Sequence, residues 1–193
     1  MNDSNATTLA AFRETGAYLS GHFRLTSGLH SPEYLQCAKV LQYPRHAERF
    51  GLEMRAALQD LTVDVVCAPA MGGLIIGHEV ARAFGVRFIF TERDGEGKMT
   101  LRRGFAIEAG ERVLIVEDVI TTGGSTREVV DLLLASGAKV LAAASIIDRS
   151  GGRADVGVPR IALATLEVTA YEAAVCPMCA QGLPVVKPGS RPS

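Results

Sequence analysis

The 193-residue chain is long enough for one domain with a sizeable core, and its composition, 48% hydrophobic and 21% charged residues, is ordinary for a globular protein. The net charge of −1 gives no general attraction to nucleic acid, and no run of about 20 apolar residues predicts a membrane span. The start, MNDSNATTLAAF, lacks the basic and apolar regions of a secretory signal, so we expect a cytoplasmic protein without a membrane or nucleic-acid partner.

The first forty residues predict a helix and then a turn-rich segment. Thr7 or Thr8 can cap a helix that ends near Gly21. Residues 22–39 follow, HFRLTSGLHSPEYLQCAK, in which alternating apolar and polar residues at the start predict a short strand, and the Ser-Gly and Ser-Pro pairs predict turns. On its residues alone, this hydroxyl-rich segment is either a surface hairpin or part of a binding site.

A unit of strand, glycine loop and helix comes after a helix that can start at Pro44. The buried strand is expected over residues 63–67, and the helix after the loop should end at Gly85. Between them, Gly72 and Gly73 either form only a tight turn or bring the backbone close to a ligand.

A polar segment follows the third expected strand, residues 86–90. The sequence TERDGEGKMTLRR, residues 91–103, is interrupted by glycines, mixed in charge and poor in apolar anchors. We therefore expect a mobile loop over about residues 92–103, followed by a returning strand over residues 104–108. Such a loop is either simply solvated or brings its basic residues to a ligand.

The stretch RVLIVEDVITTGGS, residues 112–125, has the composition of a phosphate site. Its apolar run predicts a strand buried on both faces, after which come Glu117 and Asp118 and then a loop of small hydroxyl residues and glycines. A helix is expected directly afterwards and should end near Gly137. Amide groups at a helix N-terminus can bind phosphate, whereas carboxylates repel it and suit the hydroxyls of a ribose, or a metal ion held through water. A polar turn without a ligand is the alternative.

Two further strands are expected, over residues 140–147 and about residues 161–166. The first ends at Asp148 and Arg149, at the sheet edge where ligands bind in open α/β sheets. These two residues are either a surface ion pair or part of a site in which Arg149 contacts a ligand.

The tail contains a Cys-x-x-Cys pair, Cys176 and Cys179. One such pair supplies only half of the ligands of a structural zinc site. The pair could complete a site across a dimer, form a redox couple or lie in a structural turn, and we favour the turn.

EDVITTGGS, residues 117–125, resembles the phosphoribosyl-diphosphate (PRPP) signature of type I phosphoribosyltransferases. The resemblance implies a single α/β domain over residues 1–193, in which helices flank a central, mainly parallel sheet and a small N-terminal hood covers about residues 20–42. It also implies that PRPP is bound by Glu117, Asp118, Val119, Ile120, Thr121, Thr122, Gly123, Gly124 and Ser125, with Gly72 and Gly73 at the pyrophosphate.

FRLTSGLHSPEYLQ, residues 23–36, resembles the hood that covers the base in orotate phosphoribosyltransferases. This second resemblance implies transfer of ribose 5-phosphate from PRPP to orotate, which gives orotidine 5-monophosphate and pyrophosphate in the biosynthesis of UMP. It implies that Arg149 holds the orotate carboxylate, with Thr121 and Tyr34 as further contacts of the base.

Two departures from the family pattern lie on the pyrophosphate side. Many orotate enzymes have a lysine near the position of Gly72, and residues 92–103 lack the lysine-rich, histidine-containing sequence usual in their catalytic loop. Arg93 and Lys98 are the candidates for binding PRPP and for catalysis from this loop, with two further arginines behind them.

The resemblance further implies Mg²⁺, carried mainly by the substrate, and Asp118 is both a candidate catalytic residue and a candidate to hold the ion through water. A homodimer is expected, because the loop of these enzymes often acts on the neighbouring subunit. Two alternatives stay open: a phosphoribosyltransferase for another base, and a PRPP-sensing regulator on the same fold without catalytic activity.

Overall fold

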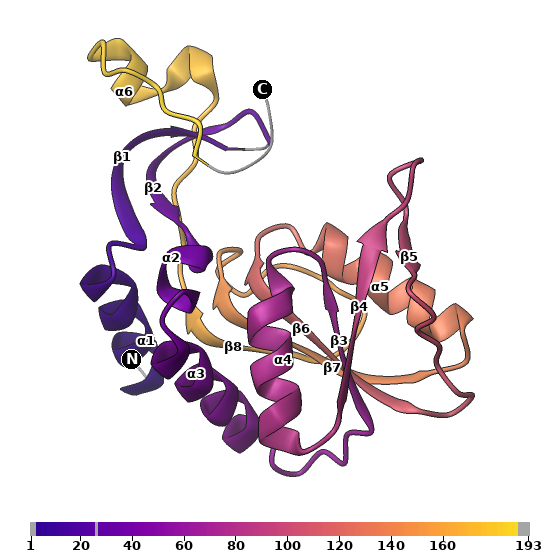
Figure 1. Ribbon diagram of the computed structural model, residues 1–193. Coiled ribbons are helices and arrows are strands. Elements are labelled where there is room, and N and C mark those ends of the chain that lie inside the picture. The colour runs from indigo at the N-terminus through magenta and orange to yellow at the C-terminus, as the bar shows by residue number, and fades with distance from the viewer. Residues whose placement is uncertain (1–2, 26, 189–193) are drawn as a thin grey trace.

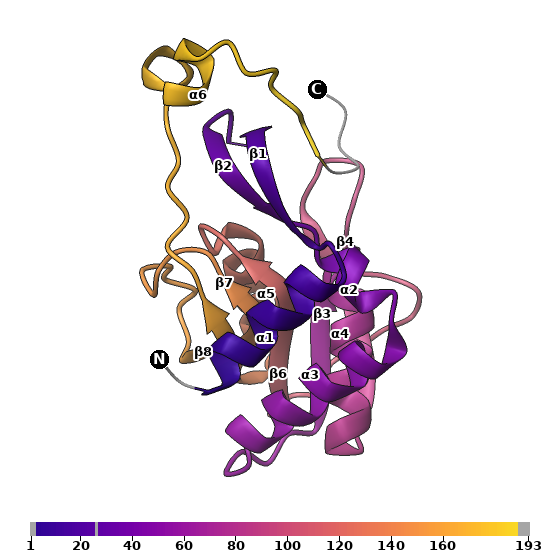
Figure 2. The same ribbon diagram turned by 90° about the vertical axis from the view of Figure 1, so that its left-hand side faces the viewer.

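A six-stranded sheet with helices on both faces forms the body of the computed structural model, which describes residues 3–25 and 27–188 (Figures 1 and 2). The strand order is β5-β4-β3-β6-β7-β8, and neighbouring strands are parallel except for the antiparallel pair β4 and β5. The strands are β3 (Val65–Pro69), β4 (Arg87–Arg93), β5 (Met99–Leu101), β6 (Arg112–Ile120), β7 (Lys139–Asp148) and β8 (Arg160–Thr165). The expected α/β fold with a mainly parallel central sheet is confirmed.

Alternate residues of the apolar run in β6 pack into two different cores, which explains why residues 113–116 are apolar without a break. Leu114 and Val116 belong to one core, and Val113 and Ile115 to the other. The first core is covered by α1 (Asp3–Glu14), α2 (Cys37–Leu41), α3 (Pro44–Ala57) and α4 (Gly73–Phe84), and the second by α5 (Gly124–Ala135). The centre of the sheet is therefore buried on both faces.

Most of the predicted helix boundaries are confirmed. Pro44 lies in the first turn of α3, and Gly85 ends α4 with a φ of 71°. Gly137 also has a positive φ, 89°, just after α5. No helix among the described residues is long and apolar enough to cross a bilayer.

The first helix is shorter than predicted. It ends at Glu14 rather than near Gly21, and Thr7 and Thr8 lie inside it rather than at its start. The chain turns at Gly16, whose φ is 63°, and then enters a strand. The apolar residues just after this turn therefore belong to a β-hairpin and not to another helical turn.

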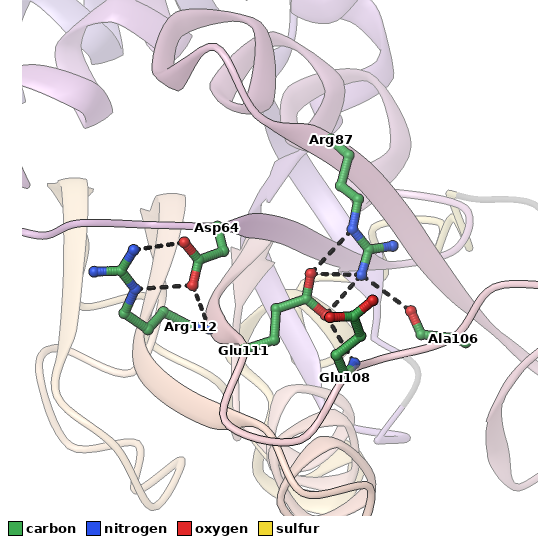
Figure 3. Close-up of polar contacts among 6 residues, drawn as sticks. All are labelled: Asp64, Arg87, Ala106, Glu108, Glu111 and Arg112. Carbon is green, nitrogen blue, oxygen red and sulfur yellow. Dashed lines mark hydrogen bonds and ion pairs between the residues drawn. The ribbon is translucent and has the colours of Figure 1, made fainter.

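The predicted returning strand over residues 104–108 is wrong, because the return is made earlier by β5. The backbone of the predicted segment is bound by side chains instead of by a neighbouring strand. The guanidinium of Arg87 donates to the carbonyl oxygen of Ala106 at 3.0 Å, and the amide of Glu108 donates to the carboxylate of Glu111 at 3.0 Å (Figure 3). These bonds satisfy backbone groups that a strand would have paired.

Two ion pairs join the starts of the central strands, at the edge of the sheet opposite to the one where β6 ends (Figure 3). Arg87 pairs with Glu111, and Arg112 donates to Asp64 both from its side chain and from its backbone amide. The hydrogen bonds from Arg112 lower the pKa of Asp64 to about 2. These contacts link the starts of β3, β4 and β6 to one another.

A β-hairpin of β1 (Tyr18–Arg24) and β2 (His30–Leu35) forms the hood, beyond the edge of the sheet where β6 ends (Figures 1 and 2). The tail of the chain runs along it with a short 3-10 helix, η1 (Ala173–Val175), and α6 (Pro177–Ala180). Val186 pairs with Phe23 of β1, and Tyr171 pairs with His30 of β2. The hood is therefore built from both ends of the sequence.

Candidate active site

The loop between β6 and α5 has the geometry of an anion site. Gly123 has a φ of 83°, and a Cβ atom there would lie 2.8 Å from Cγ1 of Val156, so only glycine fits. The first helical bond of α5 runs from the amide of Arg127 to the carbonyl oxygen of Gly123 at 2.8 Å, which leaves the amides of residues 124–126 directed away from the helix. No acidic residue lies in the first turn of α5. Glu117 and residues 119–126 line a small hollow at this point, where the helix dipole favours a negative charge.

Glu117 and Asp118 lie directly before this loop, among the last four residues of β6. The side chain of Glu117 is buried, and its Oε2 atom has no hydrogen-bond partner among the described residues. Burial raises the pKa of Glu117 well above its usual range, and the neighbouring charge of Asp118 raises it further. Burial also raises the pKa of Asp118, although the amide of Val119, which donates to Asp118 Oδ1 at 2.8 Å, opposes this shift. One carboxyl with an oxygen that lacks a donor, beside a second that accepts one amide bond, suits a ligand with neighbouring hydroxyl groups.

The glycine loop between β3 and α4 lies directly against Asp118. A Cβ atom on Gly72 would lie 2.6 Å from Asp118 Oδ1, and one on Gly73 would lie 2.9 Å from Cβ of Ala68. The peptide between Ala70 and Met71 in this loop is cis. A lysine at position 72 would collide with Asp118 in this backbone, which gives a physical reason why glycine stands there.

Arg149 lies beside the end of β6, and the hood reaches toward it. Its amide donates to the carbonyl oxygen of Ile120 at 2.8 Å, and its Nε atom is buried without a hydrogen-bond partner in the described part of the chain. Burial lowers the pKa of Arg149, an effect opposed by the nearby Tyr34 and Cys37. Burial raises the pKa of Tyr34, and the charge of Arg149 opposes that shift in turn. The structure thus brings Arg149 together with Tyr34 of β2, as the sequence predicts.

Asp148 does not pair with Arg149. Its carboxylate, which is 1% exposed, forms an ion pair with Arg160 and accepts from the hydroxyl of Ser150 at 2.6 Å. Burial raises the pKa of Asp148, but the bonds from Ser150 and Arg160 outweigh it and leave the pKa below its usual value. A surface Asp–Arg pair is therefore wrong, and the guanidinium of Arg149 stays available for a ligand.

The segment of residues 92–103 forms the hairpin of β4 and β5, which projects from the same edge of the sheet as the hood (Figure 1). Arg93 donates to Glu128 of α5 at 2.8 Å, and Lys98 pairs with Glu96 at 3.1 Å. Both cations line a cleft with Glu128 and Asp131, separate from the hollow beside Glu117. The structure therefore does not bring Arg93 and Lys98 to the other predicted site residues.

Cys37, which no sequence pattern singles out, lies against the backbone of Asp118. It is buried at the start of α2, and its Sγ atom lies 3.9 Å from the carbonyl oxygen of Asp118. Burial and the charges of Asp118 and Glu117 raise the pKa of its thiol. No motif marks Cys37, because its position depends on how the hood returns to the body.

The model of the phosphoribosyl transferase domain matches residues 47–173. The orotate phosphoribosyltransferase of Pelotomaculum thermopropionicum is 57% identical over 95% of this chain and 96% of its own length, and that of Desulforamulus reducens is 52% identical over 93% and 94%. The crystal structure of the orotate phosphoribosyltransferase from Aeropyrum pernix has a TM-score of 0.69 at 27% identity, over 82% of this chain and 93% of that one. The chain therefore belongs to the orotate phosphoribosyltransferase family of type I phosphoribosyltransferases.

Proposed function

We propose that the chain transfers ribose 5-phosphate from PRPP to orotate and releases orotidine 5-monophosphate and pyrophosphate. One observation carries the proposal: a carboxyl pair, in which Oε2 of the buried Glu117 has no hydrogen-bond partner in the described chain, lies directly beside the start of α5. A ribose 5-phosphate has both matching parts, since its hydroxyls donate to carboxylates and its phosphate accepts from amides. The full-length likeness to orotate phosphoribosyltransferases supports the choice of acceptor.

The binding of PRPP divides between two loops. Glu117 and Asp118 would accept hydrogen bonds from the 2- and 3-hydroxyls of the ribose, and the loop of residues 121–125 would hold the 5-phosphate. Gly72 and Gly73 would face the pyrophosphate, because their loop packs against Asp118 and therefore against the ribose. In this arrangement the carbon that reacts lies between the two loops.

The binding of orotate rests on Arg149. Its planar guanidinium can give two parallel hydrogen bonds to a carboxylate, and its buried Nε atom lacks a protein partner in the described chain. Tyr34 lies near Arg149 on the hood and presents a ring on which a pyrimidine can stack. Thr121, next to Ile120, would contact the same base from the opposite side of the site.

The reaction breaks the bond between C1 of the ribose and the pyrophosphate oxygen, and it joins C1 to a ring nitrogen of orotate, which gives up its proton to solvent. As the pyrophosphate leaves, positive charge develops on C1 and the ring oxygen, so the protein acts mainly by positioning and by charge stabilisation. Mg²⁺ bound with PRPP would neutralise the leaving group, and the hard oxygens of Asp118 suit the water shell of that ion.

Arg93 and Lys98 would act on the pyrophosphate after the hairpin of β4 and β5 moves. Both are held by exposed ion pairs, to Glu128 and Glu96, which cost little to break. We expect the chain to be a homodimer in which this hairpin reaches the site of the neighbouring subunit. Closure would also exclude the water that hydrolyses PRPP.

The test of the proposal is the steady-state kinetics of Arg149→Ala. Loss of a desolvated contact to a carboxylate should lower kcat/KM for orotate by about 100-fold, with a much smaller change in the KM for PRPP. Arg153→Ala is the matched control, because Arg153 is exposed in the same loop and pairs with Glu167. Equal changes in the KM values for orotate and for PRPP would show that Arg149 does not bind the base.

A panel of bases supplied with PRPP tests the reaction itself. The wild-type protein should consume orotate together with PRPP and release pyrophosphate. Consumption of a purine or of uracil instead of orotate would show that the acceptor is a different base. Binding of PRPP without turnover of any base would show a sensor instead of an enzyme.

A further inference from the structure

The tail of the chain brings two cysteines to two histidines of the hood. His22 lies on β1 and His30 on β2, whereas Cys176 and Cys179 flank the first turn of α6. Figure 2 shows α6 beyond the end of this hairpin. All four residues lie outside the region matched by the domain model, residues 47–173, and none belongs to the PRPP or orotate site.

Their side-chain atoms converge on one point. Nε2 of His22 lies 3.6 Å from the sulfur of Cys176 and 3.6 Å from that of Cys179, and Nδ1 of His30 lies 3.2 Å from the sulfur of Cys179. The two nitrogens are 2.8 Å apart, and all four atoms lie within 4.8 Å of one another. Both histidines and Cys176 are buried.

These distances match the ligand shell of zinc. An ion about 2.0–2.1 Å from nitrogen and about 2.3 Å from sulfur, with tetrahedral angles, separates a nitrogen from a sulfur ligand by about 3.5 Å. The three nitrogen–sulfur distances of 3.2–3.6 Å agree with that value. The two nitrogens are closer than the roughly 3.4 Å expected for a tetrahedral pair, and rotation of either ring can increase their separation.

A further contact prepares His22 to be a ligand. Its Nδ1 atom lies 2.8 Å from the carbonyl oxygen of Leu183, an acceptor that requires the proton to be on Nδ1. In the neutral ring of this tautomer, Nε2 offers its lone pair to the cluster. Histidine ligands of metals are generally oriented by such a bond from the other ring nitrogen.

We propose that His22, His30, Cys176 and Cys179 bind one structural zinc ion that fastens the tail to the hood. The set is Cys₂His₂, which is typical of closed tetrahedral sites, and four protein ligands leave no position for a substrate. Binding of Zn²⁺ displaces one proton from each thiol and leaves two thiolates on the ion. The hood supplies the half of the site that the single Cys-x-x-Cys pair lacks.

A redox couple formed by the two cysteines is the main rival. Both are free thiols in the structure, and although one histidine can stabilise the thiolate of a redox pair, two histidines with two cysteines complete the four ligands of a tetrahedral site. A purely hydrogen-bonded cluster is the other rival. The two rivals differ from the zinc site in metal content and in the state of the thiols.

The first experiment measures zinc in the full-length protein, purified without added metal or chelator, by mass spectrometry of the element. We expect about one zinc ion per chain in the wild type and in two control variants, and a loss of most of it in Cys179→Ser and His30→Ala. The controls are Cys67→Ala, whose thiol is buried in the sheet, and His78→Ala, whose ring is exposed on α4.

The second experiment uses the wild type alone, so that it stays informative if a variant fails to fold. Replacement of zinc by Co²⁺ should give the visible absorption of a tetrahedral site and a thiolate-to-cobalt charge-transfer band. A wild type that contains no zinc and gives no such spectrum, or that has a disulfide between Cys176 and Cys179 when isolated, would overturn the proposal.

Discussion

Glu117 illustrates how a residue proposed to bind a ligand can lower the stability of the folded protein. Its carboxyl is buried beside Asp118, and one oxygen has no partner in the described chain, so its ionised form is costly in the absence of a ligand. A ligand that donates hydrogen bonds to this oxygen would recover part of that cost. In the proposed function, this cost in stability is the consequence of placing an acceptor for a hydroxylated ligand.

We predict that Glu117→Gln stabilises the protein and weakens the binding of PRPP. In the unfolded chain a glutamate loses its proton near pH 4.3, whereas the raised pKa keeps the folded form protonated to higher pH. Over that window the folded state holds more protons, so the stability of the wild type falls as pH rises. Glutamine does not titrate, and the advantage of the variant should therefore grow with pH.

Chemical unfolding at a series of pH values above about pH 4 measures this difference. Glu172→Gln, at an exposed position, is the control and should show no such trend. A Glu117→Gln variant that is less stable than the wild type at neutral pH would contradict the prediction.

Substitution of Gly72 tests the contact between the β3–α4 loop and Asp118 of β6. An alanine there would place its Cβ atom 2.6 Å from Asp118 Oδ1, so the carboxylate would have to turn away from its bond with the amide of Val119. We expect Gly72→Ala to raise the KM for PRPP and to lower kcat/KM by about 10- to 100-fold.

Gly95→Ala is the control for this substitution. Gly95 has no heavy atom within 4 Å of the position of a Cβ and no positive φ, so kinetics and stability should stay close to the wild type. If the kinetics of Gly72→Ala also stay close to those of the wild type, the activity does not depend on the observed position of Asp118.

At the scale of an element, the hairpin of β4 and β5 combines a firm tip with a weak attachment. Asp94 accepts hydrogen bonds from the amides of Glu96 and Lys98, both at 2.9 Å, and these bonds order the turn. Its attachment to α5 includes the exposed pair of Arg93 and Glu128, and such pairs contribute at most about 1 kcal/mol. Met99 and Leu101 of β5 pack against the second core and β4 pairs with β3, so only the tip beyond these residues can move at small cost.

Lys98 lies at the tip of this hairpin, and we predict that Lys98→Ala lowers kcat by about 100-fold with little change in the binding of PRPP. The reason is that its charge would meet the pyrophosphate only as the leaving group departs. Lys139→Ala is the control, because Lys139 begins β7 at the opposite edge of the sheet. An unchanged kcat would make Lys98 an ordinary solvated charge.

The sequence predicts those elements whose signal is local. The apolar run before Glu117 and the glycines at 85 and 137 indicate the central strand and two helix ends, and the structure confirms all three. The strand predicted over residues 104–108 is wrong because Arg87 and Glu111 bind its backbone, and no local pattern shows such bonds. The contact of Cys37 with Asp118 and the partners of Cys176 cannot be predicted for the same reason, since His22 and Cys176 are separated by 154 positions.

At the scale of the whole molecule, the placement of Arg93 and Lys98 away from Arg149 raises the question of which subunit they serve. We predict that co-expression of Lys98→Ala with Arg149→Ala restores activity if the hairpin acts on the neighbouring subunit. Half of the dimers are then mixed, and each contains one site with both native residues, so the activity should reach about one quarter of the wild type.

Each variant expressed alone measures the background for this experiment. If the hairpin acts within its own chain, every site in the mixed dimer lacks one of the two residues, and co-expression should restore nothing. Size-exclusion chromatography with light scattering gives the oligomeric state of all three preparations.

The pairing of the tail with both strands of the hood makes the two ends of the chain depend on each other. The sheet ends with β8, so the phosphate loop and its helix do not need residues 171–186 as neighbours. The hood is different, because a two-stranded hairpin alone is marginally stable and its strands pair here with Tyr171 and Val186. A chain cut before residue 171 would thus keep its sheet and its phosphate loop but lose the support of its hood.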